Sequence, residues 1–531
     1  MGIIKIYFHL NNISKILNLV TSPHNKLTNI CILSDFHQFL LNICLNPCFV
    51  LSLKSLKLED LARSAVNYSM SLGSTYAEAR VQKDLANSTV MKNGTPQFSG
   101  FLREAGIGIR LIINGSLGFA STNNLTLEGI KDTILSAASM ARVAATSMKK
   151  PIRLSNLKIN KANWEVKQKH KFGSIDVEKK IELLQNIDKL FRKKSDVKFP
   201  SRILSINENL REQIFLNSEG TYITSKVPRV SFLYFMTAYK PSKGTAQRFN
   251  KKAESSGWEA ILSWDLTEFV SQEINVLASI LTKAKRPPRD KTDVILGSEV
   301  TGIVCHESCG HPFEADRILG REAAAAGESF VNMKMLGKRI GSKKVNIIDD
   351  PTIPSSYGYY LYDDEGVQAS RRELIKEGII NEFLHNRETA AELGIQSNGA
   401  ARTISYDREP IIRMSNTYMD KGDYNQQELF KAISKGVYIK SFMEWNIDDR
   451  RYNQRYVGLE AYFIKNGETK YLIRNPVIEM TTPSLFKSID AVGKDISFNA
   501  ATCGKGDPQQ GVPVWTGGPD IRLRNVKIGE A

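Results

Sequence analysis

The chain has 531 residues, of which 42% are hydrophobic and 24% charged; this composition excludes fibrous and largely disordered proteins, and the length predicts two or three domains. The net charge is +16, but lysines and arginines are spread along the chain, and the densest basic run, 149–171, contains no recognisable nucleic-acid-binding module, so we expect no nucleic-acid partner. Six cysteines are too few for the disulfide framework of a secreted protein, which favours a cytoplasmic location.

Residues 1–55 differ in composition from the rest of the chain. They are rich in Ile, Leu, Phe and Asn, and the span 27–53 has a single charge, Asp35. Asn42, Asn46 and Pro47 interrupt this span, which argues against a membrane helix. We expect a loosely attached extension, or translated sequence upstream of the true start, and no membrane partner.

An N-terminal domain of mixed helices and strands is predicted over 56–290. Apolar residues at helical spacing predict helices over 57–72, 126–148, 176–193 and 266–283. Alternating patterns and turn residues predict strands over 75–83, 88–92 and 107–113 and a β-rich region over 202–239. The run 285–290 is basic and contains two prolines, which cannot continue a helix, so we place the domain boundary there.

A β-rich C-terminal domain is predicted over 291–531. Short strands alternate there with glycine turns, which indicates a strongly curved or barrel-like β core. No glycine-rich phosphate loop follows a strand, so nucleotide binding is not expected. The predicted fold class is therefore α+β, with the candidate chemistry in the C-terminal domain.

The segment 305–312 reads Cys-His-Glu-Ser-Cys-Gly-His-Pro. It holds His306 and His311, two of only seven histidines, with Glu307 beside the first. Neutral imidazoles together with a carboxylate that can deprotonate water are typical of a catalytic zinc site. The alternative is a pair of hydrogen-bonded histidines at the end of a buried helix.

The spacing of the two histidines requires an irregular backbone. Residues i and i+5 lie about 140° apart around a regular α-helix. A single π turn would bring the two rings together. Helix termination would do the same, with Gly310 in a left-handed conformation and Pro312 forcing His311 out of the helix. The sequence leaves both possibilities open.

A catalytic zinc ion keeps three protein ligands and one open position, so a third ligand is needed. Cys503 is the best candidate, because the glycine-rich segment 502–508 would let a thiolate reach a metal without hindrance. Cys305 and Cys309 are also possible, although each fits a small buried apolar residue better. Glu314 and Asp316 either orient the histidines or are ordinary surface charges.

Several segments together resemble the TldD/PmbA metalloproteases, on the TldD side. They are the His306-Glu307-x-x-x-His311 motif and the segments 76–80, 118–122, 363–366, 413–417 and 502–506. The resemblance runs from about Leu56 to the C-terminus. It implies that His306, His311 and Cys503 hold Zn²⁺ and that Glu307 is the base. It also implies unfolded peptides as substrates, a structural role for 363–366, and a dimer, either with a second copy or with a PmbA-like subunit that lacks the metal motif.

The predicted function is hydrolysis of unfolded peptides or protein segments by a zinc-dependent peptidase. Two alternatives stay open: a thiol hydrolase with Cys503 as nucleophile and His306 as base, and a non-catalytic peptide-binding regulatory subunit. Glu307 argues against both, because neither needs a carboxylate beside His306. Arg402, Arg408 and Arg413 either steer peptide carboxyl groups or are surface charges.

Overall fold

The computed structural model describes residues 57–193, 196–322 and 327–531, and by their contacts residues 58–531 form one unit. The apolar span 27–53 lies outside the described residues. In the described part of the chain, no helix combines the length and the apolarity needed to span a lipid bilayer.

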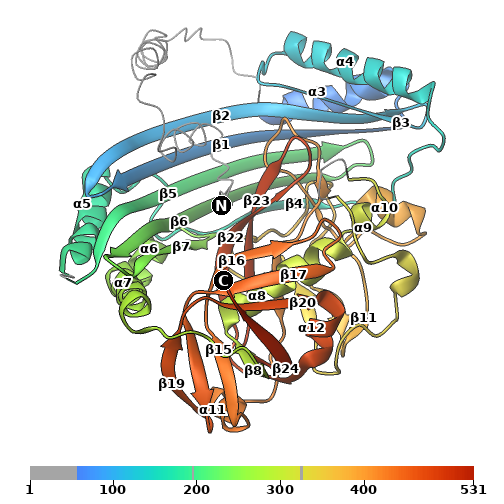
Figure 1. The fold of residues 1–531 in the computed structure, drawn as a ribbon. Coiled ribbons are helices and arrows are strands. Elements are labelled where there is room, and N and C mark those ends of the chain that lie inside the picture. The colour runs from blue at the N-terminus through green and yellow to red at the C-terminus, as the bar shows by residue number, and fades with distance from the viewer. Residues whose placement is uncertain (1–56, 194–195, 323–326) are drawn as a thin grey trace, which may run out of the picture. The chain divides into compact units, whose positions relative to one another are not determined.

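A long curved sheet forms the N-terminal half (Figure 1). Its seven described strands run in the order β3-β2-β1-β5-β6-β4, with β7 beside β6. They are β1 (Tyr76–Lys92), β2 (Thr95–Ile113), β3 (Ser116–Thr122), β4 (Lys161–Glu165), β5 (Lys198–Asn217), β6 (Tyr222–Lys240) and β7 (Gly244–Glu254). The prediction of separate strands over 75–83 and 88–92 is wrong. Leu85 pairs with Arg103 on one side and Leu210 on the other, so β1 runs without a break through the residues between the two predicted strands.

Helices cover the two ends of this sheet (Figure 1). At one end lie α3 (Leu58–Ser71) and α4 (Leu127–Ala145), which bury their apolar faces against β1 and β2. The other end carries α5 (Val177–Asp188), a 3₁₀ turn at Lys189–Lys193, α6 (Glu259–Ser263) and α7 (Leu266–Lys283). The Thr126 hydroxyl caps α4, since it accepts a hydrogen bond of 3.1 Å from the Gly129 amide. The four predicted helices are confirmed.

Two larger sheets and short helices make up the C-terminal half. Nine described strands form one mixed sheet, in the order β16-β17-β20-β24-β8-β15-β18-β19, with β21 beside β24. They are β8 (Lys291–Leu296), β15 (Lys435–Ile439), β16 (Phe442–Ile447), β17 (Asn453–Gly458), β18 (Ala461–Lys465), β19 (Glu468–Ile473), β20 (Pro476–Thr481), β21 (Ile489–Val492) and β24 (Ile521–Glu530).

The other large sheet has six described strands in the order β11-β10-β9-β14-β23-β22. They are β9 (Ile347–Asp349), β10 (Arg372–Lys376), β11 (Ile379–Ile380), β14 (Asn416–Met419), β22 (Ser497–Lys505) and β23 (Gln510–Gly518). β12 (Ala401–Arg402) and β13 (Ile411–Ile412) pair with each other. The short helices are α8 (Ser298–Cys305), α9 (Ala315–Ile318), α10 (Arg387–Glu392), α11 (Gln426–Lys431) and α12 (Thr482–Ser488), with a 3₁₀ turn at Met333–Met335. This β-rich half confirms the α+β fold class.

The first strand of the C-terminal sheets begins at residue 291, at the predicted domain boundary. Strands β1–β7 end at Glu254 and belong to the first sheet, whereas β8 begins the C-terminal sheets at Lys291. Residues 58–531 nevertheless group as one unit, so the division at 290–291 stays a prediction.

Candidate metal centre

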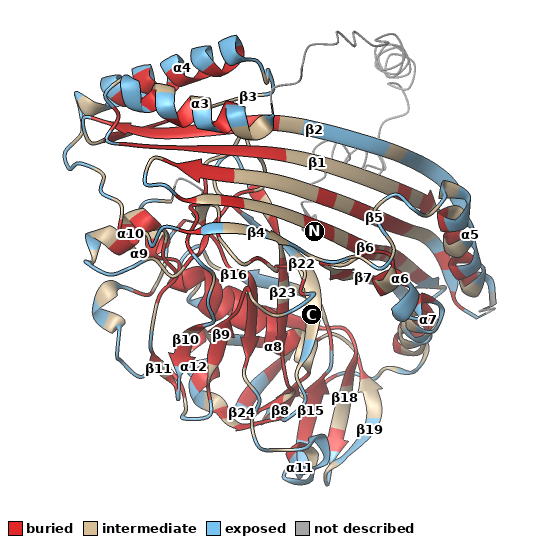
Figure 2. Cartoon of the chain, turned by 180° about the vertical axis from the view of Figure 1, so that it is seen from behind, coloured by how far each residue is buried: buried red, intermediate tan, exposed pale blue. Residues whose placement is uncertain are grey.

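Helix α8 carries the histidine motif into the interior of the C-terminal half (Figure 2). Its residues 300–305 are buried. At Gly302 an added Cβ would lie 2.7 Å from the Gly517 amide nitrogen, so only glycine lets α8 pack this closely against the backbone of β23. The histidine motif therefore follows a helix that is buried and closely packed against β23.

The helix continues from α8 into a π turn over His306–Gly310. The His311 amide donates to the His306 carbonyl, an i→i+5 hydrogen bond. Gly310 has φ −52°, so the alternative of a left-handed helix end is wrong. Gly310 is needed for space instead, because a Cβ there would overlap the Met414 sulfur. The π turn brings the His306 and His311 ring centroids to 5.0 Å.

Cys503 approaches the two imidazoles from β22. The expectation of a flexible glycine turn is wrong, because Cys503 pairs with Val512 inside the β22–β23 hairpin and the turn follows at 506–509. Its Sγ lies 3.4 Å from His311 Nε2. One potential ligand atom from each of His306, His311 and Cys503 lies within 4.8 Å of the others, and all three residues are buried. This cluster could hold a metal ion.

The electrostatics of the cluster favour a thiolate. Burial by itself raises the pKa of Cys503, but the neighbouring His311, His306 and Arg413 outweigh it and hold the pKa well below the ordinary value. Burial lowers the pKa of His311, but Cys503 and Glu314 together raise it above its usual value. The Nδ1 atom of His306 is buried and has no hydrogen-bond partner among the described residues.

Cys305 and Cys309 do not join this cluster. Both are fully buried in the hydrophobic core of the C-terminal half. Burial raises the pKa of each thiol. They therefore behave as small apolar residues, as their alternative interpretation predicts.

Glu314 orients His311, as one of the two interpretations of the sequence proposes. Its Oε2 lies 3.1 Å from His311 Nδ1 and also accepts from Arg317 Nε at 2.7 Å. Burial raises the pKa of Glu314, but Lys505, His311 and Arg317 lower it well below its usual range. The carboxylate therefore stays ionised and can hold the imidazole in one orientation.

Asp316 has a different partner and does not contact the histidines. Both its carboxylate oxygens lie 2.8 Å from Lys505 Nζ. The same Nζ lies 3.2 Å from Glu314 and 3.4 Å from Glu322. Three carboxylates that could resemble a second metal site thus surround an ammonium group. Lys505 lies two residues after Cys503 on β22, so this ion cluster also anchors the strand.

Glu307 forms an ion pair with Arg451 that the sequence did not suggest. Arg451 Nη1 lies 2.6 Å from Glu307 Oε2, and both side chains are nearly buried. Burial raises the pKa of Glu307, but Arg451, His311 and His306 outweigh it and lower the pKa. Arg451 lies between β16 and β17 with a left-handed backbone (φ 63°), far from the motif in the chain. No local pattern in the sequence marks it.

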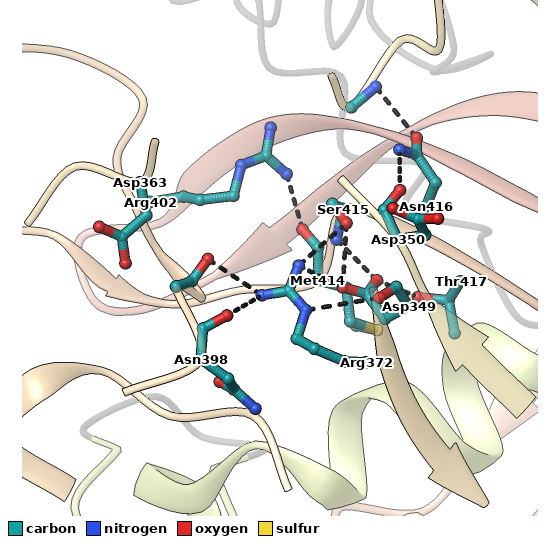
Figure 3. Close-up of polar contacts among 12 residues, drawn as sticks. Asp349, Asp350, Asp363, Arg372, Asn398, Arg402, Met414, Ser415, Asn416 and Thr417 are labelled. Atoms are coloured by element: carbon teal, nitrogen blue, oxygen red, sulfur yellow. Dashed lines mark hydrogen bonds and ion pairs between the residues drawn. The ribbon is translucent and has the colours of Figure 1, made fainter. Parts of the chain in front are cut away.

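Buried arginines hold the framework behind the cluster. Arg413 donates to the Cys503 carbonyl and, at 2.7 Å, to the Gln510 carbonyl, which clamps both strands of the β22–β23 hairpin. It is fully buried and so does not steer peptide carboxyl groups. Arg372 and Asp349, also fully buried, are 2.7 Å apart and link β10 to β9 (Figure 3). The framework fixes the backbone on which the candidate ligands stand.

Residues 363–366 connect the C-terminal half to the first sheet, as the predicted structural role requires. Glu365 Oε1 accepts from Arg110 of β2 at 2.8 Å. Asp364 Oδ1 accepts from Gln213 of β5 at 2.7 Å. The carboxylates of Glu365 and Asp364 therefore bind protein donors of the first sheet.

Comparisons with known proteins identify relatives of this chain. Three models of the PmbA/TldA metallopeptidases match the chain: domain 1 at 77–141, the central domain at 170–285 and the C-terminal domain at 289–530. A metalloprotease of Methanocaldococcus jannaschii is 31% identical over 84% of this chain and 95% of its own length. A zinc metalloprotease TldD homolog of Saccharolobus solfataricus is 30% identical over 86% of this chain and 97% of its own. The crystal structure of TldE from Thermococcus kodakarensis has the same fold, with a TM-score of 0.70 at 17% identity over 88% of this chain and 100% of that one.

Proposed function

Because the chain belongs to the PmbA/TldD family of metallopeptidases, we propose that it is a zinc-dependent peptidase that cleaves unfolded peptides or protein segments. The observation that carries this proposal is the convergence of His306, His311 and Cys503 beside Glu307. It also rests on the relatives, which are named metalloproteases, one of them a zinc metalloprotease.

The donor set suits zinc. Two imidazole nitrogens and one thiolate sulfur are ligands that Zn²⁺ prefers, and three protein ligands leave one position open. The unpartnered Nδ1 of His306 and the lowered pKa of Cys503 are the features expected of groups that bind a cation. Zinc, when bound, would supply a Lewis acid that polarises a water molecule and the scissile carbonyl.

The chain's own residues would then move the proton. Glu307 leaves the helix one residue after His306, so it can face a water molecule near the cluster without joining the three candidate ligands. As an ionised carboxylate it accepts the proton from the attacking water at one oxygen and returns it to the leaving amine. Arg451 holds the other carboxylate oxygen in place, and Glu314 holds the His311 ring.

A thiol hydrolase is the second candidate, because Cys503 Sγ lies 3.4 Å from His311 Nε2 and its pKa is lowered. Both His311 and the His306 that the sequence suggests adjoin this thiol, and His311 has the 3.4 Å contact expected of a base. A Cys–His hydrolase would work without metal, and it gives Glu307 no role.

The proposal extends to partners and location. We expect a dimer, with a second copy of the chain or with a PmbA-like subunit. A reducing cytoplasm would keep Cys503 available as a ligand; Cys305, Cys309 and Cys503 are free thiols in the described chain.

The test is metal analysis of the purified protein beside cleavage of an unstructured peptide. About one zinc per chain is expected, together with cleavage that a chelator abolishes and added zinc restores. Full activity in metal-free protein would replace this proposal by the thiol hydrolase. Stoichiometric zinc without cleavage of any unstructured peptide would point to the regulatory subunit.

A further inference from the structure

A polar cavity of about 220 Å³ lies between the first sheet and the segment 357–404 of the C-terminal half. It is separate from the candidate metal centre. Gly511 and Pro513 of β23 line the cavity, whereas Val512, the strand partner of Cys503, does not. Successive strand residues point to opposite faces, so the β22–β23 hairpin separates the cavity from the Cys503 side chain.

One wall of the cavity is a polar stripe on the first sheet. Apart from Glu208 and Val230, the lining residues of β5 and β6 alternate along each strand, which places them on a single face. Most of them carry amide, hydroxyl or guanidinium groups: Asn207, Asn209, Arg211, Gln213, Ser225, Arg229 and Ser231. A sheet face that packs only to fill a core would be apolar at these positions. The stripe therefore offers hydrogen bonds toward the cavity.

Two arginines of the lining have no carboxylate partner among the described residues. Arg229 donates only from Nε, to the Tyr357 carbonyl at 3.2 Å. Arg402 donates to the carbonyls of Met414 at 2.6 Å and Pro513 at 2.9 Å. Burial, followed by the nearby Arg211 and Arg402, lowers the pKa of Arg229 to about 9. Two guanidinium groups thus meet at the cavity, and neither is ion-paired within the described part of the chain.

The acidic groups of the lining are already occupied. Asp364 accepts from Gln213 Nε2 at 2.7 Å and from the Thr403 amide at 2.8 Å. Asp363 accepts from backbone amides, among them that of Val367 at 2.8 Å. Glu208 forms an ion pair with Lys180. Neither arginine therefore has a hydrogen bond to the cavity's own carboxylates among the described residues, and Asp364 attracts Arg402 only at longer range.

The opposite wall is aromatic, and the edge strand β4 of the first sheet brings an unused donor against it. Four tyrosines line it, at 357, 359, 360 and 362. The Tyr360 ring faces the Arg402 guanidinium at 5.2 Å, and Trp164 of β4 meets Tyr359 edge to face at 5.9 Å. Trp164 Nε1 is buried and has no hydrogen-bond partner among the described residues.

We propose that this cavity binds the C-terminal carboxylate of a short peptide, with the carboxylate at Arg229 and Arg402 and the peptide groups on the polar stripe. Guanidinium groups bind carboxylates through paired hydrogen bonds, and amides and hydroxyls match peptide groups. Pockets for drug-sized ligands have about 300–1,000 Å³, so this smaller cavity fits a terminal residue or two. Asp364 would repel a dianion such as phosphate more strongly than a monocarboxylate. The choice of a peptide as ligand rests on the proposed peptidase function.

The test is calorimetric titration of the full-length, chelator-treated protein with N-acetyl-Ala-Ala, its C-terminal amide and inorganic phosphate. The free acid should bind at least tenfold more tightly than the amide. Arg229→Gln should weaken binding of the acid by about tenfold or more, because the variant loses a charge-assisted hydrogen bond to the carboxylate. The matched control is Arg286→Gln, which removes the same charge from a side chain that is 84% exposed.

Two further measurements serve as controls for the titration. Arg229→Lys keeps the charge and should retain part of the affinity, which guards against a folding defect in Arg229→Gln. Binding should change the tryptophan fluorescence, and Trp164→Phe should remove that change while binding persists. Equal affinity for acid and amide, unchanged binding in Arg229→Gln, or binding of phosphate alone would overturn the proposal. The titration needs neither metal nor turnover. These outcomes therefore leave the peptidase proposal untouched, and a failure of the peptidase proposal would not change the measured affinities.

Discussion

Arg451 Nη1 lies 2.6 Å from Glu307 Oε2, although 144 residues separate the two in the chain. The contact joins the loop between β16 and β17 to the π turn that holds the histidines. A guanidinium in this position fixes the carboxylate and keeps it ionised. It links the candidate base to an element that no sequence motif identifies.

Arg451 should therefore act as a positioning residue for Glu307. Arg451→Ala is expected to lower turnover by roughly 10–100-fold with zinc content unchanged, because a charge-assisted hydrogen bond contributes about 1.5–3 kcal/mol. Arg451→Lys should recover part of the loss, since it keeps the charge but not the fork geometry. Arg450→Ala is the matched control; that side chain is 64% exposed. Wild-type turnover in Arg451→Ala, or loss of zinc, would contradict this role.

Glu307→Gln separates proton transfer from metal binding. Glutamine keeps the volume of the side chain but cannot accept the proton, and general base catalysis typically contributes about 10²–10⁴-fold. Turnover on an unstructured peptide should fall by at least about 100-fold while zinc and peptide binding remain. His306→Ala should lose zinc and activity together. Cleavage by Glu307→Gln within a few-fold of wild type would rule out this water-activation mechanism.

Cys503→Ala tests the third ligand. We expect this variant to lose zinc, measured by metal analysis after dialysis, because two imidazoles alone hold the ion weakly. Cys305→Ala and Cys309→Ala are the matched controls and should keep zinc, since both side chains lie in the apolar core. Stoichiometric zinc at wild-type affinity in Cys503→Ala would mean that another residue completes the site.

His385 should make stability depend on pH. It is buried, its Nδ1 lies 3.1 Å from Thr389 Oγ1, and burial lowers its pKa from 6.5 to about 4. The folded state therefore binds the proton less readily than the unfolded state. The stabilisation is complete above about pH 6.5 and is lost as the pH falls toward 4, and it amounts to about 3 kcal/mol at most.

Urea unfolding of wild type and His385→Gln at several pH values measures this effect. The free energy of unfolding of wild type, minus that of the variant, should fall by up to about 3 kcal/mol between pH 7 and pH 4. A difference that stays constant over this range would show that His385 does not titrate as its burial predicts.

Deleting residues 1–54 should leave a folded, zinc-loaded and active protein. The proposed chemistry lies entirely beyond this segment, and the family models match from residue 77 onward. Thermal unfolding, zinc content and peptide cleavage of the shortened chain can be compared with those of the full chain. Loss of folding or of zinc would assign the segment a structural role.

The local elements and the candidate cluster were accessible from the sequence. Apolar residues at helical spacing predicted α3, α4, α5 and α7, and Thr126 marked the start of α4. Both signals come from residues that are close together in the sequence. The motif at 305–312 and Cys503 were selected by residue chemistry and by resemblance to the family. The tertiary structure brings these side chains together, and their role as zinc ligands stays a prediction.

Only the tertiary structure decided how the cluster is built. His306 and His311 converge through a π turn, and Gly310 leaves room for the Met414 side chain instead of taking a left-handed backbone. Cys503 stands on a strand because β22 pairs with β23, a pairing that glycine content alone did not suggest. Arg451 and Lys505 reach Glu307 and Asp316 across 144 and 189 residues. Contacts at such separations arise from the order in which strands pack, and no local sequence pattern encodes that order.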